Sequence, residues 1–192
     1  MRTIVITSEL LSDKTDEHSS NRETLKFSMK TDKKIIKYKD LTRLRQKATK
    51  EKKTTVFTSG CYDILHLGHV IHFNYCKSLA DILVVTAGND KTIRELKGNG
   101  RPINNEQFRS RLLAALEIVD YVVISEEYGK MDHEESMKLL KPDIFVVNAT
   151  DSAIAEKKEL AEALGVKLVA CKRLPPNNFK GGISTTSIAN KL

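Results

Sequence analysis

The chain has 192 residues, of which 40% are hydrophobic and 30% are charged. This length predicts one domain with a sizeable core, since about 150 residues are typical of a domain. The three cysteines show no CxxC spacing, which argues against a disulfide framework and a zinc site, and the longest apolar runs are too short to span a membrane. We therefore expect a cytoplasmic protein without a signal peptide or a membrane segment.

The net charge of +7 lies entirely in the first part of the chain. Residues 1–53 contain 15 Lys and Arg against 8 Asp and Glu, whereas residues 54–192 contain 17 of each kind. A neutral main body argues against nucleic-acid binding, which depends on basic side chains that contact phosphates. The basic excess indicates either a solvated helix and tail or a docking site for an acidic partner.

The beginning of the chain is predicted to be an extension that leads into a helix. A short strand is expected at Thr3–Thr7. Residues 12–34 are polar and have no period, which is typical of a linker. Asp40–Lys52 places apolar residues at helical spacing, with Asp40 as the expected N-cap.

From Thr54 onward, short apolar runs alternate with amphipathic stretches. Continuous β-branched runs are typical of parallel strands that helices cover on both faces. The five predicted strands are Val56–Thr58, Ile82–Thr86, Tyr121–Ile124, Ile144–Val147 and Val166–Ala170. The predicted helices lie at residues 69–79, 105–117, 133–140 and 153–164. This alternation predicts an α/β fold with a doubly wound, five-stranded parallel sheet.

The first of these strands leads into the segment FTSGCYDILHLGH, residues 57–69. In doubly wound sheets the first strand–helix junction is a common phosphate site. Gly60 lets the backbone approach a ligand closely, and His66 and His69 flank Gly68 so that both imidazoles can face one side of a helix N-terminus. Free amides and the helix dipole favour an anion there. We interpret the two histidines as an electrostatic clamp for a polyphosphate.

The HLGH element after GCYD resembles the HxGH signature of the nucleotidyltransferase superfamily, whose members have Rossmann-like α/β folds and include cytidylyltransferases and adenylyltransferases. GISTTSI, residues 182–188, resembles a second motif of this superfamily, at the start of the final helix. Hydroxyls and first-turn amides there suit phosphate oxygens. The resemblance implies a set of nucleotide-binding residues: Ser59, Gly60, Cys61, Tyr62, His66, Gly68, His69, Ser184, Thr185 and Thr186.

One subfamily resembles this chain more closely. LKGNGRPI at residues 96–103, Arg109 with the following LLAALEIVDYVV, and KPDIFVV resemble the adenylyltransferase domain of bacterial ADP-heptose synthases. That domain transfers AMP from ATP to D-glycero-D-manno-heptose 1-phosphate and releases pyrophosphate. The resemblance covers roughly Lys33 to Leu192. We therefore divide the chain into an N-terminal extension, residues 1–32, and a nucleotidyltransferase domain, residues 33–192.

The resemblance also implies roles for individual residues. The attacking phosphate is already an anion, so catalysis is expected to depend on positioning and charge stabilisation rather than on a general base. The expected catalytic residues are His66, His69, Lys77 and Arg109. The expected substrate-binding residues are Asp63, Asn89, Asp90, Lys97 and Arg101. For Asp63, Asn89 and Asp90 a simple turn role is an alternative.

No cofactor other than Mg²⁺ is expected, and the ion is expected to be held mainly by the nucleotide because no carboxylate cluster resembles a metal cage. Related nucleotidyltransferases are commonly homodimers, so a homodimer is expected here as well. The expected substrates are ATP and a sugar phosphate, with no nucleic-acid partner and no membrane partner.

The chain departs from its relatives after KPDIFVV, where they carry a GGD-like segment and this chain has Asn148-Ala149-Thr150-Asp151. In the family this loop borders the nucleotide and the acceptor. A CTP-dependent cytidylyltransferase that acts on a polyol phosphate is therefore the nearest alternative, although LKGNGRPI favours ATP. A non-catalytic nucleotide-binding module is a second alternative. The absence of a KMSKS-like loop argues against a class I aminoacyl-tRNA synthetase core.

Overall fold

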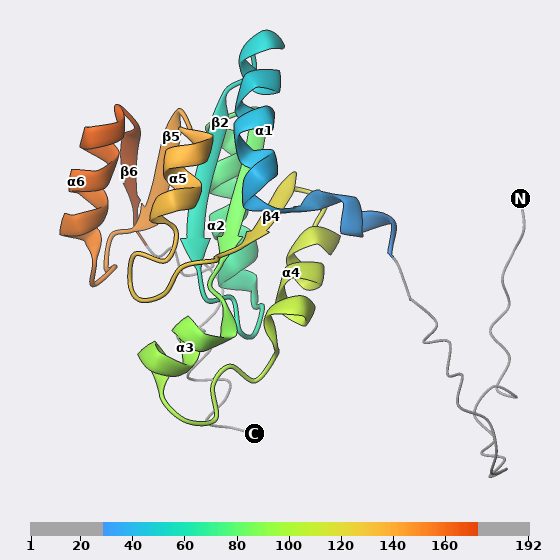
Figure 1. Ribbon diagram of the computed structural model, residues 1–192, viewed down its shortest axis with the longest axis vertical. Helices are drawn as coiled ribbons and strands as arrows, with labels where there is room; N and C mark the ends of the chain where they lie inside the picture. Colours follow the sequence, from blue (N-terminus) through green and yellow to red (C-terminus); the bar gives the residue numbers. More distant parts are fainter. Residues whose placement is uncertain (1–28, 173–192) are drawn as a thin grey trace, which may run out of the picture.

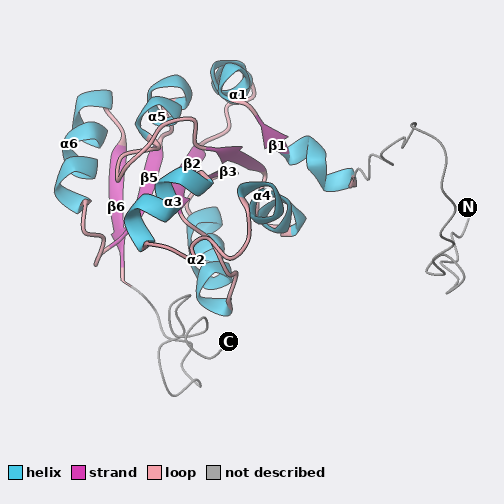
Figure 2. Ribbon diagram, turned by 60° about the horizontal axis from the view of Figure 1, so that its bottom comes forward, coloured by secondary structure: helices cyan, strands magenta, loops and turns pink. Residues whose placement is uncertain are grey.

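The described strands form a single parallel sheet, and helices cover both of its faces (Figures 1 and 2). The computed structural model describes residues 29–172, so the strand predicted at Thr3–Thr7 and the GISTTSI motif lie outside the described residues. The strand order is β1-β4-β3-β2-β5-β6. The strands are β1 (Ile35–Ile36), β2 (Thr55–Gly60), β3 (Ile82–Ala87), β4 (Tyr121–Ile124), β5 (Ile144–Asn148) and β6 (Lys167–Cys171). The predicted α/β class is confirmed.

The sheet has six strands among the described residues, whereas the sequence predicts five. The additional strand, β1, lies at the sheet edge, where Ile35 is opposite Val122 and Ile36 is opposite Val123 of β4. Strands usually have about five or six residues, so two isoleucines between lysine-rich segments give too short a pattern to predict a strand. The two isoleucines form a strand only because they pair with β4 in the folded protein.

The predicted helices all form, with small differences at their ends. The helical elements are η2 (Lys30–Lys34, a 3-10 helix), α1 (Tyr38–Lys50), α2 (Leu67–Ser78), α3 (Asp90–Lys97), α4 (Glu106–Ala115), α5 (Glu134–Leu140) and α6 (Ile154–Leu164). The short helix α3 was not predicted. Asp40 contributes to the N-terminal cap of α1, as predicted, but from inside the helix: Lys37 is the N-cap residue, and the Asp40 carboxylate accepts a hydrogen bond from the Lys37 amide at 3.3 Å.

Part of the predicted linker is packed against the domain. Lys34, in η2, donates from Nζ to the carbonyl oxygens of Leu116 at 3.0 Å and Val119 at 2.7 Å. Asp32 and Arg111 form an ion pair at 3.4 Å. Residues 30–34 are therefore anchored beside α4 and do not behave as a linker, although the boundary between extension and domain remains a prediction.

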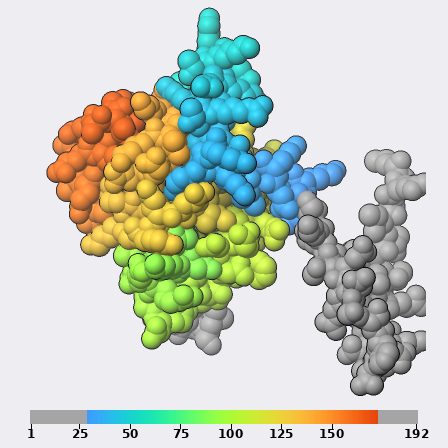
Figure 3. Space-filling model, in the orientation of Figure 1, coloured from blue at the N-terminus to red at the C-terminus, as the bar shows by residue number. Residues whose placement is uncertain are grey.

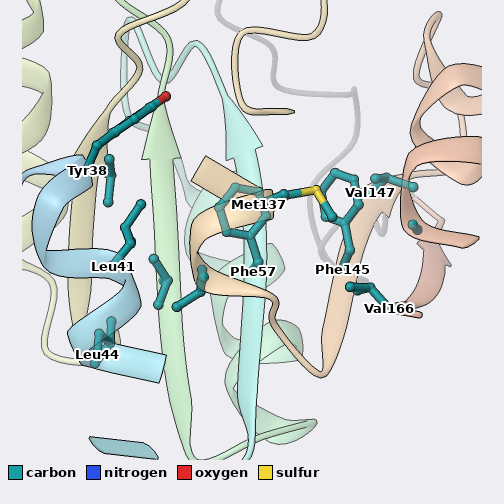
Figure 4. Packing of buried hydrophobic residues seen from close by; sticks show 12 residues of the cluster. Tyr38, Leu41, Leu44, Phe57, Met137, Phe145, Val147 and Val166 are labelled. Atoms are coloured by element: carbon teal, nitrogen blue, oxygen red, sulfur yellow. The ribbon is translucent and has the colours of Figure 1, made fainter. Parts of the chain in front are cut away.

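Two hydrophobic cores lie on opposite faces of the sheet. One contains Phe57 of β2 and Phe145 of β5, together with residues of α1, α5 and α6 such as Met137 (Figure 4). The other contains the neighbouring Val56 and Phe73 of α2, because successive strand residues point to opposite faces. The outer surface over the first core is formed by α1, α5 and α6 (Figure 3).

The strand order reverses direction between β2 and β5, which gives the sheet a topological switch point. The chain moves outward from β2 through β3 to β4 and then returns to β5 on the other side of β2. Ligands of such sheets bind outside the carboxyl ends of the strands at this reversal. Figure 1 shows α3 at the end of the sheet towards which the strand arrows point. Among residues 29–172, no helix is both long and apolar enough to cross a membrane.

Candidate active site

The loop between β2 and α2 is shaped by a glycine and a tyrosine. β2 ends at Gly60, and Tyr62 follows in the left-handed region with φ of 50°. A Cβ at Gly60 would lie 2.9 Å from Cζ of Tyr62, so the ring can occupy its buried position only beside a glycine. The ring packs edge-on against His69, with centroids 5.3 Å apart, and against Phe73 at 5.2 Å. Tyr62 is therefore a packing residue of the loop, and its side chain supports one histidine of the predicted clamp.

His66 and His69 lie together at the N-terminus of α2, as predicted. Their rings are stacked, with centroids 3.8 Å apart and an angle of 22° between the planes. His66 is the N-cap residue, and its backbone amide faces Nδ1 of His69 at 3.4 Å. A Cβ at Gly68 would lie 2.9 Å from Cε1 of His66, so the HxGH spacing depends on glycine at this position. Two imidazoles are thus fixed beside the amide groups that begin the helix, where the dipole favours an anion.

A third histidine on α2 belongs to the interior. His72 Nε2 lies 2.9 Å from the hydroxyl of Thr58 in β2. Burial lowers the pKa of His72, so the neutral ring is favoured. It anchors α2 to β2 and is not part of the stacked pair.

Asp63 joins the first loop to the segment that contains LKGNGRPI. Its Oδ1 accepts hydrogen bonds from the amides of Ile103 at 2.8 Å and Asn104 at 3.0 Å. Its Oδ2 forms a 2.7 Å ion pair with Arg101. Asp63 is therefore more than a turn residue. Because the Arg101 guanidinium pairs with this buried carboxylate, both predicted substrate-binding residues hold the loop in place.

Arg109 lies beneath the site with its side chain fully buried. Its guanidinium donates to the carbonyl oxygens of Asn104 at 2.9 Å and Cys61 at 2.6 Å, and to Oδ1 of Asp90 at 2.7 Å. The expected catalytic role, which would require Arg109 to contact a phosphate directly, does not agree with this placement, because the guanidinium is used by protein groups on three segments. Arg109 and Asp90 instead tie α3, α4 and the first loop together.

Asn89 caps α3 and connects it to the loop after β4. Its Oδ1 accepts from the Thr92 amide at 2.8 Å, and its Nδ2 donates to the carbonyl oxygens of Ser125 at 3.1 Å and Glu127 at 2.6 Å. The turn and cap alternative therefore accounts for the Asn89 side chain. No sugar hydroxyl is needed to satisfy it.

Lys97 is exposed at the C-terminus of α3. Burial raises the pKa of the Cys61 thiol, and the charge of Lys97 acts in the opposite direction. The ammonium group is thus within electrostatic reach of the first loop. Cys61 is expected to stay a protonated thiol at neutral pH, which fits a packing role.

Lys77 lies at the amino end of the sheet, where the strands begin, and not at the carboxyl end with the histidines. α2 runs from the carboxyl edge back to the amino edge, and at 1.5 Å per residue its last turn is about 15 Å from the histidines. Lys77 forms a 2.6 Å ion pair with Asp120, which precedes β4, and donates to the carbonyl of Asp81, which precedes β3. The structure therefore does not bring Lys77 together with the other predicted catalytic residues.

The loop after β5, where the chain departs from its relatives, is held by its own side chains. Asn148 Oδ1 accepts from the amide and the hydroxyl of Thr150 at 3.1 and 3.0 Å. Asp151 accepts a hydrogen bond from the amide of Ala153, the N-cap residue of α6, at 2.9 Å and pairs with Lys157 at 2.8 Å. Burial acts to raise the pKa of Asp151, but the hydrogen bonds from Lys157 and from the Ala153 amide, together with the charge of Lys157, outweigh it and the pKa is lowered. This carboxylate therefore stabilises the start of α6.

The structure adds one group that sequence reasoning did not single out. Ser125, which follows β4, donates from its hydroxyl to Oδ2 of Asp132 at 2.8 Å, and both residues are buried. In the sequence they belong to a polar stretch between a strand and a helix, which gives no signal of burial. The predicted residues Ser184, Thr185 and Thr186 lie outside the described part of the chain.

Comparison with known proteins identifies the family. A family model described as cytidylyltransferase-like matches residues 57–191. The chain belongs to the cytidylyltransferase-like family. This membership confirms the predicted superfamily and the predicted enzyme class, nucleotidyltransferase.

Relatives extend the match beyond the family model. The chain is 39% identical over 163 residues to a protein named "Bifunctional protein HldE" from Campylobacter fetus subsp. fetus, covering 84% of this chain and 32% of that protein. A protein of the same name from Nitratiruptor sp. is 41% identical over 143 residues, covering 74% of this chain and 28% of that protein. The family member described here thus spans about a third of the length of these relatives.

Solved structures agree on the fold. The lipopolysaccharide core biosynthesis protein from Thermoplasma volcanium is 29% identical, with a TM-score of 0.54 over 65% of this chain and 99% of that chain. Pantoate-beta-alanine ligase from Francisella tularensis is 17% identical, with a TM-score of 0.56 over 82% of this chain and 76% of that chain. At that identity the second likeness concerns the fold alone.

Proposed function

We propose that this nucleotidyltransferase transfers AMP from ATP to a sugar 1-phosphate. A phosphate oxygen of the sugar phosphate forms a bond to the α-phosphorus of ATP, the bond from that phosphorus to the bridging oxygen breaks, and pyrophosphate leaves. The observation that carries the proposal is the stacked pair of His66 and His69, which Gly68 permits at the N-terminus of α2. Imidazoles and first-turn amides at one place suit a triphosphate and the charge that develops on it.

The remaining residues position the reaction. The nucleophile is already an anion, so no general base is needed and catalysis depends on alignment and charge stabilisation. Lys97 is an exposed cation whose charge acts on Cys61 of the first loop, so we assign it to a phosphate of the acceptor or the leaving group. Asp63 and Arg109 act through the loops that they fix. Ser184, Thr185 and Thr186 remain proposed ligands of the β- and γ-phosphates.

Mg²⁺ enters the proposal only as the counter-ion of the triphosphate. Among residues 29–172, no group of three or more His, Cys, Asp or Glu side chains could hold a metal ion. An ion that keeps most of its ligands from phosphates and water needs no such cage. None of the roles assigned to side chains here depends on the metal.

The choice of ATP and of a heptose 1-phosphate is supported by the LKGNGRPI segment and by the bifunctional HldE relatives. The family description, cytidylyltransferase-like, is also compatible with the alternative, a cytidylyltransferase that uses CTP and a polyol phosphate. The HxGH element contacts phosphates and is the same for both nucleotides. Base selection must therefore come from the loops around the base, of which Asn148–Asp151 is one.

A pyrophosphate-release screen tests the proposal. ATP and CTP are each combined with a panel of sugar 1-phosphates and polyol phosphates, and kcat/KM is measured for every pair. We expect at least a tenfold preference for ATP with heptose 1-phosphate, because an unpaired base edge disfavours the wrong nucleotide. His66→Ala and His69→Ala should each lower turnover by about two to three orders of magnitude.

The outcomes separate the alternatives. A preference for CTP would overturn the adenylyltransferase assignment and leave the family assignment intact. Nucleotide binding without pyrophosphate release from any acceptor would favour the non-catalytic module. We also propose that the protein is a cytoplasmic homodimer.

A further inference from the structure

Asp132 lies where three strands of the sheet end. Its Oδ2 accepts a hydrogen bond from the hydroxyl of Ser125, which follows β4, and that hydroxyl accepts from the amide of Asn89, which follows β3. A Cβ at Gly88 would lie 3.0 Å from Oδ2 of Asp132 and 3.9 Å from the carbonyl oxygen of Gly60, the last residue of β2. The carboxylate therefore lies at the carboxyl edge, beside the start of the first loop.

Within the described part of the chain, this buried carboxylate has no lysine or arginine partner. Its side chain is 11% exposed, and among residues 29–172 no lysine or arginine lies within 4.0 Å of it. Besides Ser125, its neighbour is Nδ1 of His133 at 3.6 Å. Burial lowers the pKa of His133, whose ring packs between Phe57 and Phe145, so the imidazole is neutral near pH 7.

A carboxylate has about four positions for accepting hydrogen bonds, and two protein neighbours leave at least one of them for a ligand. Burial of a charge is costly unless hydrogen bonds compensate it, and among residues 29–172 the hydroxyl of Ser125 is the one donor at normal distance. The charge of Asp132 also acts on the Cys61 thiol, as the charge of Lys97 does, which places both groups within electrostatic reach of the first loop.

The sign of the charge restricts the ligand group. Both substrates of the proposed reaction carry phosphates, which a carboxylate repels. The uncharged donors in these substrates are the hydroxyls of the sugar and the ribose and the amino group of the base. Hydrogen bonds from hydroxyls to an ionised carboxylate are short and strong, and they discriminate well because the loss of the donor leaves the buried charge unpaired.

We propose that Asp132 is a specificity-determining residue that accepts hydrogen bonds from hydroxyls of the acceptor sugar. The inference rests on the proposed function, because it requires a hydroxylated phosphate as acceptor. It assigns Asp132 to the sugar part and Lys97 to the phosphate part of the same ligand. The ribose of the nucleotide presents the same hydroxyl chemistry, so the experiment includes an arm that distinguishes the two sources.

The test compares Asp132→Asn with the matched control Glu126→Gln. Glu126 lies in the same loop with an exposed side chain, so both variants remove one negative charge. Pyrophosphate release is measured with ATP and heptose 1-phosphate, and with its 2-, 3- and 4-deoxy derivatives. We expect Asp132→Asn to raise the KM of the acceptor at least tenfold and to change the KM of ATP less than twofold. Glu126→Gln should change neither.

The deoxy derivatives measure the loss of kcat/KM when one hydroxyl is removed, and this loss would not depend on Asp132 if its role were only structural. The wild type should lose at least tenfold in kcat/KM with one or more of them, whereas Asp132→Asn should lose less than twofold with the same compounds. An unchanged KM of the acceptor, an equal loss for every derivative in both proteins, or a rise in the KM of ATP alone would overturn the inference. The last result would assign Asp132 to the ribose instead.

Asp132→Glu covers the case in which the asparagine variant does not fold. It keeps the charge and moves the carboxylate by one methylene, so it should raise the KM of the acceptor and spare that of ATP. If the wild type releases no pyrophosphate with any sugar phosphate, the proposed function fails and this inference with it. If the wild type is active but Asp132→Asn leaves the KM of the acceptor unchanged, this inference fails and the proposed function stands.

Discussion

The imidazole of His66 lies over that of His69, with ring centroids 3.8 Å apart, and Gly68 is the residue that leaves room for this arrangement. The stacking holds the two imidazole rings nearly parallel at the beginning of α2. A phosphate chain that reaches the first turn of the helix can therefore meet amides and imidazoles together.

Gly68→Ala should separate activity from stability. The added Cβ would lie 2.9 Å from Cε1 of His66 and would displace the ring, so we expect kcat to fall by about two orders of magnitude. Alanine favours a helix over glycine by about 0.5–1 kcal/mol, so we expect no comparable fall in the free energy of unfolding. Steady-state kinetics and urea unfolding measure the two quantities. Asn74→Ala, at an exposed position of the same helix, is the control, and equal kinetics in both variants would contradict the role of the stack.

Arg109→Met should destabilise the protein. The substitution leaves the Asp90 carboxylate and the carbonyl oxygens of Cys61 and Asn104 without their donor, and we expect a loss of about 3 kcal/mol in the free energy of unfolding. Arg109→Lys keeps the charge but cannot reproduce the forked geometry, so an intermediate loss is expected. Urea unfolding checks both. A stable methionine variant that only fails to bind ATP would instead favour the direct phosphate contact.

Lys77→Met tests the placement of Lys77 at the amino edge. Its pair with Asp120 is about one third exposed on each side, so the loss of stability should be at most about 1 kcal/mol. Because Lys77 lies about two to three helical turns along α2 from the histidines, kcat/KM should stay within twofold of the wild type. A hundredfold loss of kcat/KM in a folded variant would restore Lys77 to the catalytic residues.

The stability should fall as the pH decreases below 6.5. Burial lowers the pKa of His72 and of His133 below the ordinary value of 6.5, so the unfolded chain binds protons at a higher pH than the folded protein does. This contribution is complete above pH 6.5 and is lost as the pH falls towards the folded-state pKa. Urea unfolding at pH 7.5 and 5.5 measures the difference. His72→Gln should reduce it, and an unchanged pH dependence in that variant would argue against a buried neutral His72.

The proposed homodimer has a candidate surface on α4. Phe108 and Leu112 lie one turn apart and are 57% and 46% exposed, and Ile103 nearby in the sequence is 48% exposed. Apolar side chains of this size at the surface favour an interface. Light scattering should report a dimer at micromolar concentration, and Phe108→Asp should shift it towards the monomer. A wild type that is only monomeric would reject the prediction.

The sequence determined the layered fold and the position of the phosphate site. Continuous apolar runs such as Ile82–Thr86 are sufficient to predict buried parallel strands, and the HLGH element is local, so that four consecutive residues carry its geometry. The periodicity within single segments likewise located α1, α2, α4, α5 and α6, but not the short helix α3.

The tertiary structure decided the features that depend on contacts between distant segments. The strand β1 exists only through its pairing with β4, and the roles of Arg109 and Asp63 depend on partners that lie many residues away. Lys77 was assigned by resemblance, and the direction of α2 placed it at the other edge of the sheet. Asp132 gives no signal in a polar loop, because burial of a carboxylate arises only when the ends of separate strands come together. A side chain's type and spacing follow from the sequence, whereas its solvent exposure and its partners follow from the packing of distant segments.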